Sequence, residues 1–371
     1  MVRRVYRDDF RAGMVLASAI LSDGGLFLLS EGVVLNDDHL RLLRSNGVPF
    51  IHVREGEAFA PREGGVPPLI PEGSMAGAVE ALKGAFASAA QGDEELLGAR
   101  LEGLIPVVAE IQDQVLSQPE MVAHCQDLRG HDDYTFRHSV HVMVISLLMG
   151  KALEMPEGML TALAMGAVLH DIGKTQIPVE ILNKPGRLNP EEMRVMRRHP
   201  EMGAEMLEGS RLVSPESRRV LAQHHERWDG SGYPLGLKGR EIHPFARQVA
   251  VADVYDALAS ARPYKTQRFA HEVYRYVRCQ SGTLFDPKVV EVFSRVTTPY
   301  PVGTWMLLSS GHVGMVTRVE RGNTLRPEVT VVHHTRTGTL STPLVLDLAA
   351  HPRLQVRDIL PAEPGYEVCP R

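Results

Sequence analysis

Three side chains with acid–base or metal-binding chemistry stand together in an apolar stretch, at His170, Asp171 and Lys174. The pattern predicts that this stretch is part of an apolar helix. On a helix, His170 and Asp171 point about 100° apart, and Lys174 lies one turn after His170 on the same face. Burying these groups costs several kcal/mol unless their charge is compensated. A bound metal ion would compensate it, so the stretch is a candidate metal site.

Further candidate ligands follow the same pattern, in which a histidine or an aspartate interrupts a predicted apolar helix. A lone histidine on such a helix is more often a satisfied core residue than a ligand, but this many buried polar groups are rarely all satisfied by chance. Imidazole and carboxylate groups together suit Fe, Mn, Ni, Co or Zn. So many ligands would hold more than one ion, and two neighbouring metals are a common solution for phosphodiester hydrolysis. The candidates are His138, His199, His224, His225 and Asp253.

The composition is that of a globular protein with no general affinity for nucleic acid. The chain has 371 residues, of which 44% are hydrophobic and 23% charged, and its net charge is −5. Its 3 cysteines lie far apart, without metal-ligand spacing, and fit a reducing compartment. We find neither a signal peptide nor an apolar run long enough to span a membrane, and therefore expect a cytoplasmic protein. Eight of the 16 histidines fall between His124 and His225, so the chemistry is concentrated in the middle of the chain.

Hydrophobic periodicity predicts a mainly α protein with a small domain at each end of a helical core. Residues 1–55 combine short strands with one helix and are expected to form a small α/β accessory or regulatory domain. Residues 56–75 are rich in proline and glycine and predict a linker. Residues 76–126 predict amphipathic connecting helices with a role in the core or in a homodimer. The remaining boundaries are 127–298 for the helical catalytic domain and 299–371 for a small β-rich unit.

Several motifs, in this order and at this spacing, resemble the HD-GYP domains of the HD superfamily of metal-dependent phosphohydrolases. The resemblance covers residues 134–295 in detail, and the joint occurrence of the motifs is highly specific. The segments on either side also resemble parts that accompany this domain in some members. The motifs are Leu169–Pro178 with the His170-Asp171 doublet, Lys184-Pro185-Gly186, His199, His224–Pro234 and Arg262-Pro263-Tyr264.

The resemblance implies a helical HD-type core that holds two metal ions, Fe or Mn in the first place, with Ni, Co or Zn as alternatives. One ion would be held by His138, His170, Asp171 and Asp253. The other would be held by Asp171, His199, His224 and His225, so that Asp171 bridges the two. Family members with a third metal carry a glutamate one turn before the first histidine. This chain has Tyr134 there, which favours two metals.

The resemblance further implies hydrolysis of cyclic di-GMP to pGpG and, as in many family members, onward to GMP, which would lower a bacterial second messenger. We expect a hydroxide that bridges the metals to attack phosphorus in line. Lys174 matches the family's catalytic lysine and would stabilise the developing charge or protonate the leaving oxygen. The alternative interpretation of Lys174 is a salt bridge to Asp171.

A glycine-rich loop and two basic residues are the expected contacts of the dinucleotide. In Gly232-Tyr233-Pro234, the tyrosine offers an aromatic face and the proline stiffens the loop, although a tight interhelical turn explains the same residues. Arg262 and Lys265 match the family's basic pair that meets the substrate, and cations suit phosphate or guanine contacts.

Two other functions stay open at this stage. One is a cyclic-dinucleotide sensor with little turnover, which the complete ligand set and Lys174 disfavour. The other is an HD hydrolase of another phosphoester, including a different cyclic dinucleotide. The expected partner is cyclic di-GMP as substrate, without DNA, RNA or membrane, while residues 1–55 are a candidate docking module for other proteins.

Overall fold

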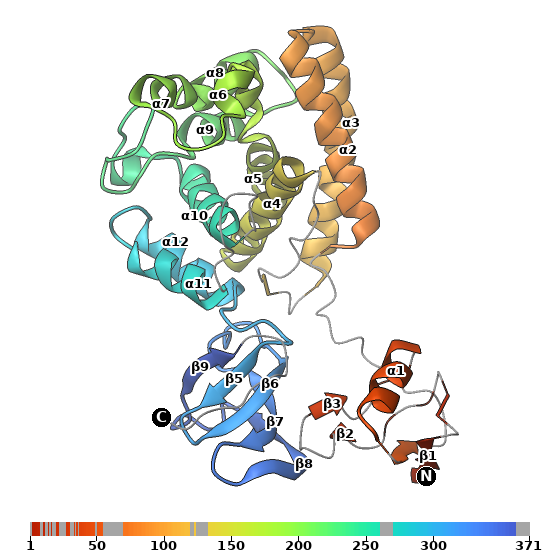
Figure 1. Cartoon of the computed structure of the whole chain (residues 1–371). Helices are drawn as coiled ribbons and strands as arrows, with labels where there is room; N and C mark the ends of the chain where they lie inside the picture. Colours follow the sequence, from red (N-terminus) through yellow and green to blue (C-terminus); the bar gives the residue numbers. More distant parts are fainter. Residues whose placement is uncertain are drawn as a thin grey trace. The chain divides into compact units, whose positions relative to one another are not determined.

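The computed structural model describes most of the chain and is drawn in Figure 1. Contacts divide the chain into two compact units, which we describe separately. One unit is Pro67–Pro301 with Glu320–Leu325, and the other contains the remaining residues from both ends of the chain. The described residues are 70–118, 122–123, 133–259 and 270–360, together with residues 2–54 with gaps.

The larger unit is helical, as the sequence predicted. Helices α2 and α3 pack against each other and against α4, while α5 packs against α4 and α9. Helix α2 begins within the predicted linker 56–75, of which residues 56–69 lie outside the described residues. The long helices are α2 (Glu72–Gln91), α3 (Glu94–Ser117), α4 (Tyr134–Ala152), α5 (Glu157–Leu169), α10 (Pro244–Ala259), α11 (Ala270–Cys279) and α12 (Pro287–Val296). The shorter ones are the 3-10 helix η3 (Ile172–Gln176), α6 (Val179–Leu182), α7 (Pro190–Met196), α8 (His199–Met206), α9 (Pro215–Gln223) and the 3-10 helix η4 (Gly239–Glu241).

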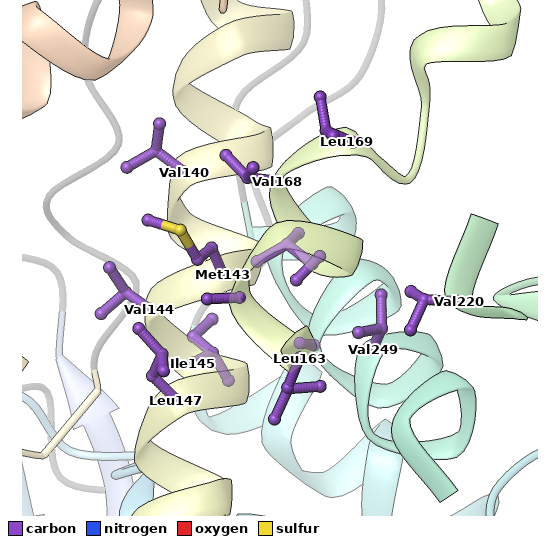
Figure 2. Packing of buried hydrophobic residues seen from close by; sticks show 14 of the residues in the cluster. Val140, Met143, Val144, Ile145, Leu147, Leu163, Val168, Leu169, Val220 and Val249 are labelled. Atoms are coloured by element: carbon purple, nitrogen blue, oxygen red, sulfur yellow. The ribbon is translucent and has the colours of Figure 1, made fainter. Parts of the chain in front are cut away.

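Helices α4 and α5 form the centre of the hydrophobic core. Every residue of α4 from His138 to Gly150 is buried, because neighbouring helices cover this part of α4 on all sides. Figure 2 shows Met143 and Ile145 of α4 close to Leu163 of α5, with Val249 of α10 nearby. Burying a side chain of this size contributes about 1.5–3 kcal/mol relative to leaving it exposed. The candidate ligands on α4 and beside α5 are therefore attached to the hydrophobic core of the unit.

The two ends of the chain form small β structures. In the N-terminal residues, β1 (Val2–Tyr6) pairs with β4 (Phe50–Arg54), β2 (Ile20–Leu21) pairs with β3 (Phe27–Leu29), and all pairs are antiparallel. Helix α1 (Asp37–Ser45) contributes Leu40 and Leu43 to their small core. The C-terminal residues form an antiparallel sheet in the order β8-β7-β6-β5-β9. Its strands are β5 (Trp305–Leu308), β6 (His312–Arg318), β7 (Glu328–His334), β8 (Gly338–Asp347) and β9 (Val356–Leu360).

These elements agree with the predicted fold class, a mainly α protein with a small α/β region before the helices and a β-rich region after them. Within the described residues, no helix combines the length and the apolar character needed to cross a bilayer.

The expectation that His170 and Asp171 lie inside a helix is wrong. Helix α5 ends at Leu169, and the doublet forms the junction between α5 and η3. The backbone NH of Lys174 donates to the carbonyl of Asp171 at 2.9 Å, which tightens the chain into the 3-10 turn. The consequence is that Lys174 lies beside Asp171 rather than on the face of His170.

A close approach of two backbones fixes this junction. Gly173 of η3 lies directly against α8, at the carbonyl of His199 and at Gly203. A Cβ on Gly173 would lie 2.6 Å from the backbone nitrogen of Gly203, a distance that requires one of the two helices to move. The absence of a side chain at Gly173 therefore lets α8 bring His199 next to Asp171.

We expect Gly173→Ala to lower the free energy of unfolding by about 1–3 kcal/mol, because the added carbon meets backbone that cannot move cheaply. Gly103→Ala in the middle of α3 is the control, since a Cβ on Gly103 would have nothing within 4 Å of it. That variant should be stabilised by about 0.5–1 kcal/mol through helix propensity. Urea unfolding of the metal-free proteins, followed by circular dichroism, measures both changes. Equal midpoints for Gly173→Ala and the parent would contradict the close approach.

Candidate metal centre

The predicted ligands converge from separate elements of the helical unit, mostly from helix ends. His138 lies in the second turn of α4, and Asp253 lies within α10. His199 is the first residue of α8. The prediction that each ligand interrupts a helix is therefore wrong for the doublet 170–171 and for residues 224–225, which follow the last residue of α9. The backbone at a helix end is less constrained than in mid-helix, so side chains there can be directed towards a common centre more freely.

Two overlapping groups of ligand atoms form this centre. The first contains Asp171, His199, His224 and His225, and the second contains His138, His170 and Asp171. Within each group the ligand atoms all lie within 4.8 Å of one another, and almost all of these side chains are buried. Asp171 belongs to both groups, which is the geometry expected of a bridging ligand.

The carboxylate of Asp171 is surrounded by imidazole nitrogens. Its Oδ1 lies 3.4 Å from Nε2 of His199 and 3.8 Å from Nε2 of His224, while its Oδ2 lies 3.4 Å from Nε2 of His170. Oδ1 of Asp171 and Nε2 of His170 are buried without a hydrogen-bond partner. Since a buried polar atom rarely lacks a partner, these orphaned atoms and the donor set fit a metal ion at this position.

Backbone carbonyls orient three of the histidines. Nδ1 of His170 donates to the carbonyl of Ala167 at 2.7 Å, and Nδ1 of His199 donates to that of Met196 at 2.8 Å. Nδ1 of His224 donates to the carbonyl three residues before it at 2.9 Å. A carbonyl only accepts, so each of these rings carries its proton on Nδ1 and presents the Nε2 lone pair to the centre.

Asp253 completes the centre from α10. Its Oδ1 lies 3.1 Å from Nε2 of His138, and its Oδ2 lies 4.0 Å from Nδ1 of His225. Burial alone would raise the pKa of Asp253, but its hydrogen bond with His138 and the neighbouring imidazoles hold the pKa far below its ordinary value. Asp253 is therefore an anionic ligand candidate that adjoins both groups.

The pKa values of the histidines differ, and those of His224 and His225 suit metal binding. Burial, reinforced by the adjacent His225, keeps the pKa of His224 well below its ordinary value, and burial lowers the pKa of His225 to about 3. Both rings are thus neutral at pH 7, as a ligand must be. Burial would also lower the pKa of His138, but its hydrogen bonds with Asp253 and Asp256 raise it well above its usual value.

Lys174 is paired with the shared carboxylate. Its Nζ lies 2.5 Å from Oδ2 of Asp171, so the alternative predicted from the sequence, a salt bridge, is present. The side chain of Lys174 is 31% exposed, whereas that of Asp171 is 3% exposed. Burial would raise the pKa of Asp171, but the charges of His170 and Lys174 hold it well below its ordinary value. Lys174 thus lies between the buried centre and solvent.

The Gly-Tyr-Pro loop lies against the ligands. The ring of Tyr233 lies 4.8 Å from that of His225 at 32°, and the guanidinium of Arg197 lies 5.1 Å from the centroid of the Tyr233 ring. A Cβ on Gly232 would meet the backbone of Glu226, 2.5 Å from its Cα, so Gly232 has a packing role in this loop. Burial and the carboxylates of the centre raise the pKa of Tyr233, which keeps its hydroxyl protonated.

Two buried carboxylates near the centre were not predicted from the sequence. Glu226 accepts hydrogen bonds from the backbone NH groups of Leu235 at 2.7 Å and Leu237 at 3.0 Å, which ties the Gly-Tyr-Pro loop to the end of α9. Asp256 lies one turn after Asp253 and meets His138 at 2.6 Å. The only sequence signal for Asp256 was the spacing of three from Asp253 on a predicted apolar helix.

Of three other positions singled out in the sequence, the structure describes only Tyr134. Arg262 and Lys265 lie outside the described residues, and their contacts with a substrate remain predictions. Tyr134 is the first residue of α4, and its ring is stacked on that of His138 at 6.0 Å and 12°.

Comparison with known families places this centre in a defined class. Residues 119–289 match the model of a family described as HD domain. The match contains all the candidate ligands, from His138 to Asp253, so these residues are an HD domain. The His170-Asp171 doublet and Gly232-Tyr233-Pro234 identify it as the HD-GYP kind, which confirms the family predicted from the sequence.

Three relatives show how far the similarity extends. A cyclic di-GMP phosphodiesterase of Pseudomonas aeruginosa is 40% identical over 242 residues, 65% of this chain and 58% of the relative. A cyclic di-GMP phosphodiesterase of Thermotoga maritima is 41% identical over 186 residues, 49% of each chain. A 3′3′-cGAMP-specific phosphodiesterase of Vibrio cholerae is 43% identical over 125 residues, 33% of this chain and 24% of the relative. The chain thus spans less than two thirds of each relative.

We expect Asp171→Asn to reduce the bound metal to less than half of the parent value, because the amide replaces the anionic oxygen shared by both ligand groups. Elemental mass spectrometry after anaerobic reconstitution with Mn²⁺ measures the content. Asp113→Asn, an exposed position on α3, is the control and should retain full occupancy. Unchanged metal content in Asp171→Asn would exclude Asp171 as a ligand.

Proposed function

We propose that this protein is a metal-dependent phosphodiesterase that hydrolyses cyclic di-GMP to pGpG and onward to GMP. One observation carries the proposal: a buried carboxylate, Asp171, is shared by two groups of imidazole ligands and lies beside a partly exposed lysine, Lys174. We infer from this arrangement two cation sites next to a proton donor. The names of the relatives from Pseudomonas aeruginosa and Thermotoga maritima support cyclic di-GMP as the substrate.

The ligand groups suit two divalent ions, with Fe or Mn favoured by the mixture of imidazole and carboxylate, and Ni, Co or Zn as alternatives. Once bound, the ions would polarise the phosphoryl oxygens and supply a nucleophile at neutral pH. The first would be held by His138, His170, Asp171 and Asp253. The second would be held by Asp171, His199, His224 and His225.

Lys174 acts on the leaving group in this proposal. A phosphodiester resists hydrolysis partly because its leaving alkoxide is a strong base. The Nζ of Lys174 is 2.5 Å from Asp171, which keeps the ammonium close to the reacting phosphate. From this position Lys174 can stabilise the developing charge or donate a proton to the leaving oxygen.

The Gly-Tyr-Pro loop and the basic pair would hold the dinucleotide. Tyr233 is neutral and presents an aromatic ring beside His225, which suits stacking with a guanine base. Arg262 and Lys265 are proposed to contact the phosphates or the Hoogsteen edge of guanine. Gly232 and Pro234 shape the loop that carries Tyr233.

A second candidate substrate is 3′3′-cGAMP, because a phosphodiesterase of Vibrio cholerae specific for it matches this chain at 43% identity. The two cyclic dinucleotides share both phosphodiesters and differ in one base, so the metal centre treats them alike. Discrimination must come from base contacts.

We expect Lys174→Met to lower kcat about 10²–10⁴-fold while metal content stays unchanged, because a charged proton donor is lost. Lys174→Arg is the matched variant, since arginine keeps the charge but does not release a proton at neutral pH. Recovery of kcat in Lys174→Arg indicates charge stabilisation, and no recovery indicates proton transfer. Full turnover by Lys174→Met would contradict any catalytic role.

We expect kcat/KM for cyclic di-GMP to exceed that for 3′3′-cGAMP by about tenfold or more, the effect of about 1.4 kcal/mol from a guanine contact. Product chromatography of anaerobically purified, Mn²⁺-reconstituted protein measures both rates. The reversed preference would favour the second candidate. A metal-loaded protein that binds cyclic di-GMP without hydrolysing it in a single turnover would instead be a sensor.

A further inference from the structure

We propose that Asp256 is a positioning residue that holds His138 in the tautomer and orientation required for metal binding. The inference rests on the proposed metal centre and adds a residue to it. Oδ2 of Asp256 lies 2.6 Å from Nδ1 of His138, and both side chains are buried, with 2% and 6% exposed. This is among the shortest polar contacts in the described part of the helical unit.

The two carboxylates of α10 lie within hydrogen-bond distance of the two ring nitrogens of His138. Asp253 and Asp256 are three residues apart, so they lie on the same face of the helix. Oδ1 of Asp253 lies 3.1 Å from Nε2 of His138, on the side of the centre, while Asp256 meets the opposite nitrogen. Asp253 is thus placed to share a metal with Nε2 of His138, and Asp256 is placed behind the ring.

Asp256 decides which nitrogen of His138 keeps its proton when a metal binds. An ionised carboxylate only accepts hydrogen bonds, so Nδ1 donates to Asp256. A metal bound between His138 and Asp253 would then displace the proton on Nε2 and leave the one on Nδ1 in place. A carboxylate behind a ligand histidine also raises the basicity of the ring. His170, His199 and His224 have backbone carbonyls in this place, and a carbonyl has no net charge.

The surroundings of Asp256 leave this role to His138 rather than to the next histidine of α4. Nδ1 of His141 lies 3.6 Å from Oδ1 of Asp256, beyond hydrogen-bond distance. The ring of Tyr134 lies nearly parallel to that of His138, with 6.0 Å between the centroids. The short contact with Asp256 is therefore the interaction that orients the His138 ring from behind.

The inference predicts a selective defect. Asp256→Asn should weaken the Mn²⁺ site that contains His138 by about 10–100-fold and leave the site of His199, His224 and His225 unchanged. The amide can turn its NH₂ group towards the ring, which would move the imidazole proton to Nε2 and block the ligand position. Calorimetric titration of metal-free protein with Mn²⁺ resolves the two binding events.

Asp286→Asn is the matched control, because Asp286 is also buried but serves a structural ion pair with Arg247 at 2.8 Å. We expect that variant to lose thermal stability and to keep both Mn²⁺ affinities. Equal losses at both Mn²⁺ sites in Asp256→Asn, or no loss at either, would overturn the inference.

A double-mutant cycle separates positioning from general stabilisation. If Asp256 acts through His138, Asp256→Asn should change Mn²⁺ affinity strongly in the parent and hardly at all in a His138→Gln background. Additive effects of the two substitutions would contradict this role.

A third measurement uses the unaltered chain and so does not depend on a variant that folds. In Zn²⁺-loaded protein, nitrogen NMR should show a proton on Nδ1 of His138, and a ring protonated on Nε2 would overturn the inference. All these readouts report metal binding rather than turnover, so they stand apart from the choice of substrate. A protein that takes up no metal would instead refute the proposed function itself.

Discussion

The burial of Asp171 among imidazoles is the interaction on which the rest of the helical unit depends. A carboxylate that is 3% exposed pays a large desolvation cost, and Lys174 at 2.5 Å compensates only one of its oxygens. The other oxygen, Oδ1, has no hydrogen-bond partner. Because the same oxygen faces His199 and His224, the surrounding helices are arranged to complete this carboxylate with a cation.

The packing of the unit explains how this unfavourable group is tolerated. Helix α4 is buried from His138 to Gly150, so it provides apolar contact along most of its length and carries one ligand in its second turn. The contact of Gly173 with α8 then sets the distance between Asp171 and His199. The packing of α4 and the contact of Gly173 with α8 thus hold the ligands close together, although burying the charge of Asp171 is unfavourable by itself.

The sequence identified the side chains that gather at the centre, but it did not predict their local structure. The candidate ligands were recognisable as polar residues within apolar runs. Their order along the chain also matched that of the HD-GYP motifs. Helix periodicity could not show that α5 stops at Leu169, because the 3-10 turn that follows is stabilised by contacts with α8, a segment distant in the sequence. Asp256 was missed for a related reason, since its partner His138 is 118 residues away and only tertiary structure brings them together.

The loop that carries Tyr233 provides an uncharged aromatic surface beside a separate positive charge. Burial raises the pKa of Tyr233 and lowers that of its neighbour His225, so both side chains are uncharged at pH 7. The two rings therefore form an uncharged aromatic surface. The guanidinium of Arg197, an exposed residue, also lies over the Tyr233 ring. Glu226 accepts backbone hydrogen bonds from Leu235 and Leu237 and so restrains the loop just after Tyr233. The proposed substrate, a cyclic dinucleotide with flat bases joined by two anionic phosphates, would suit a surface on which stacking and charge come from separate groups.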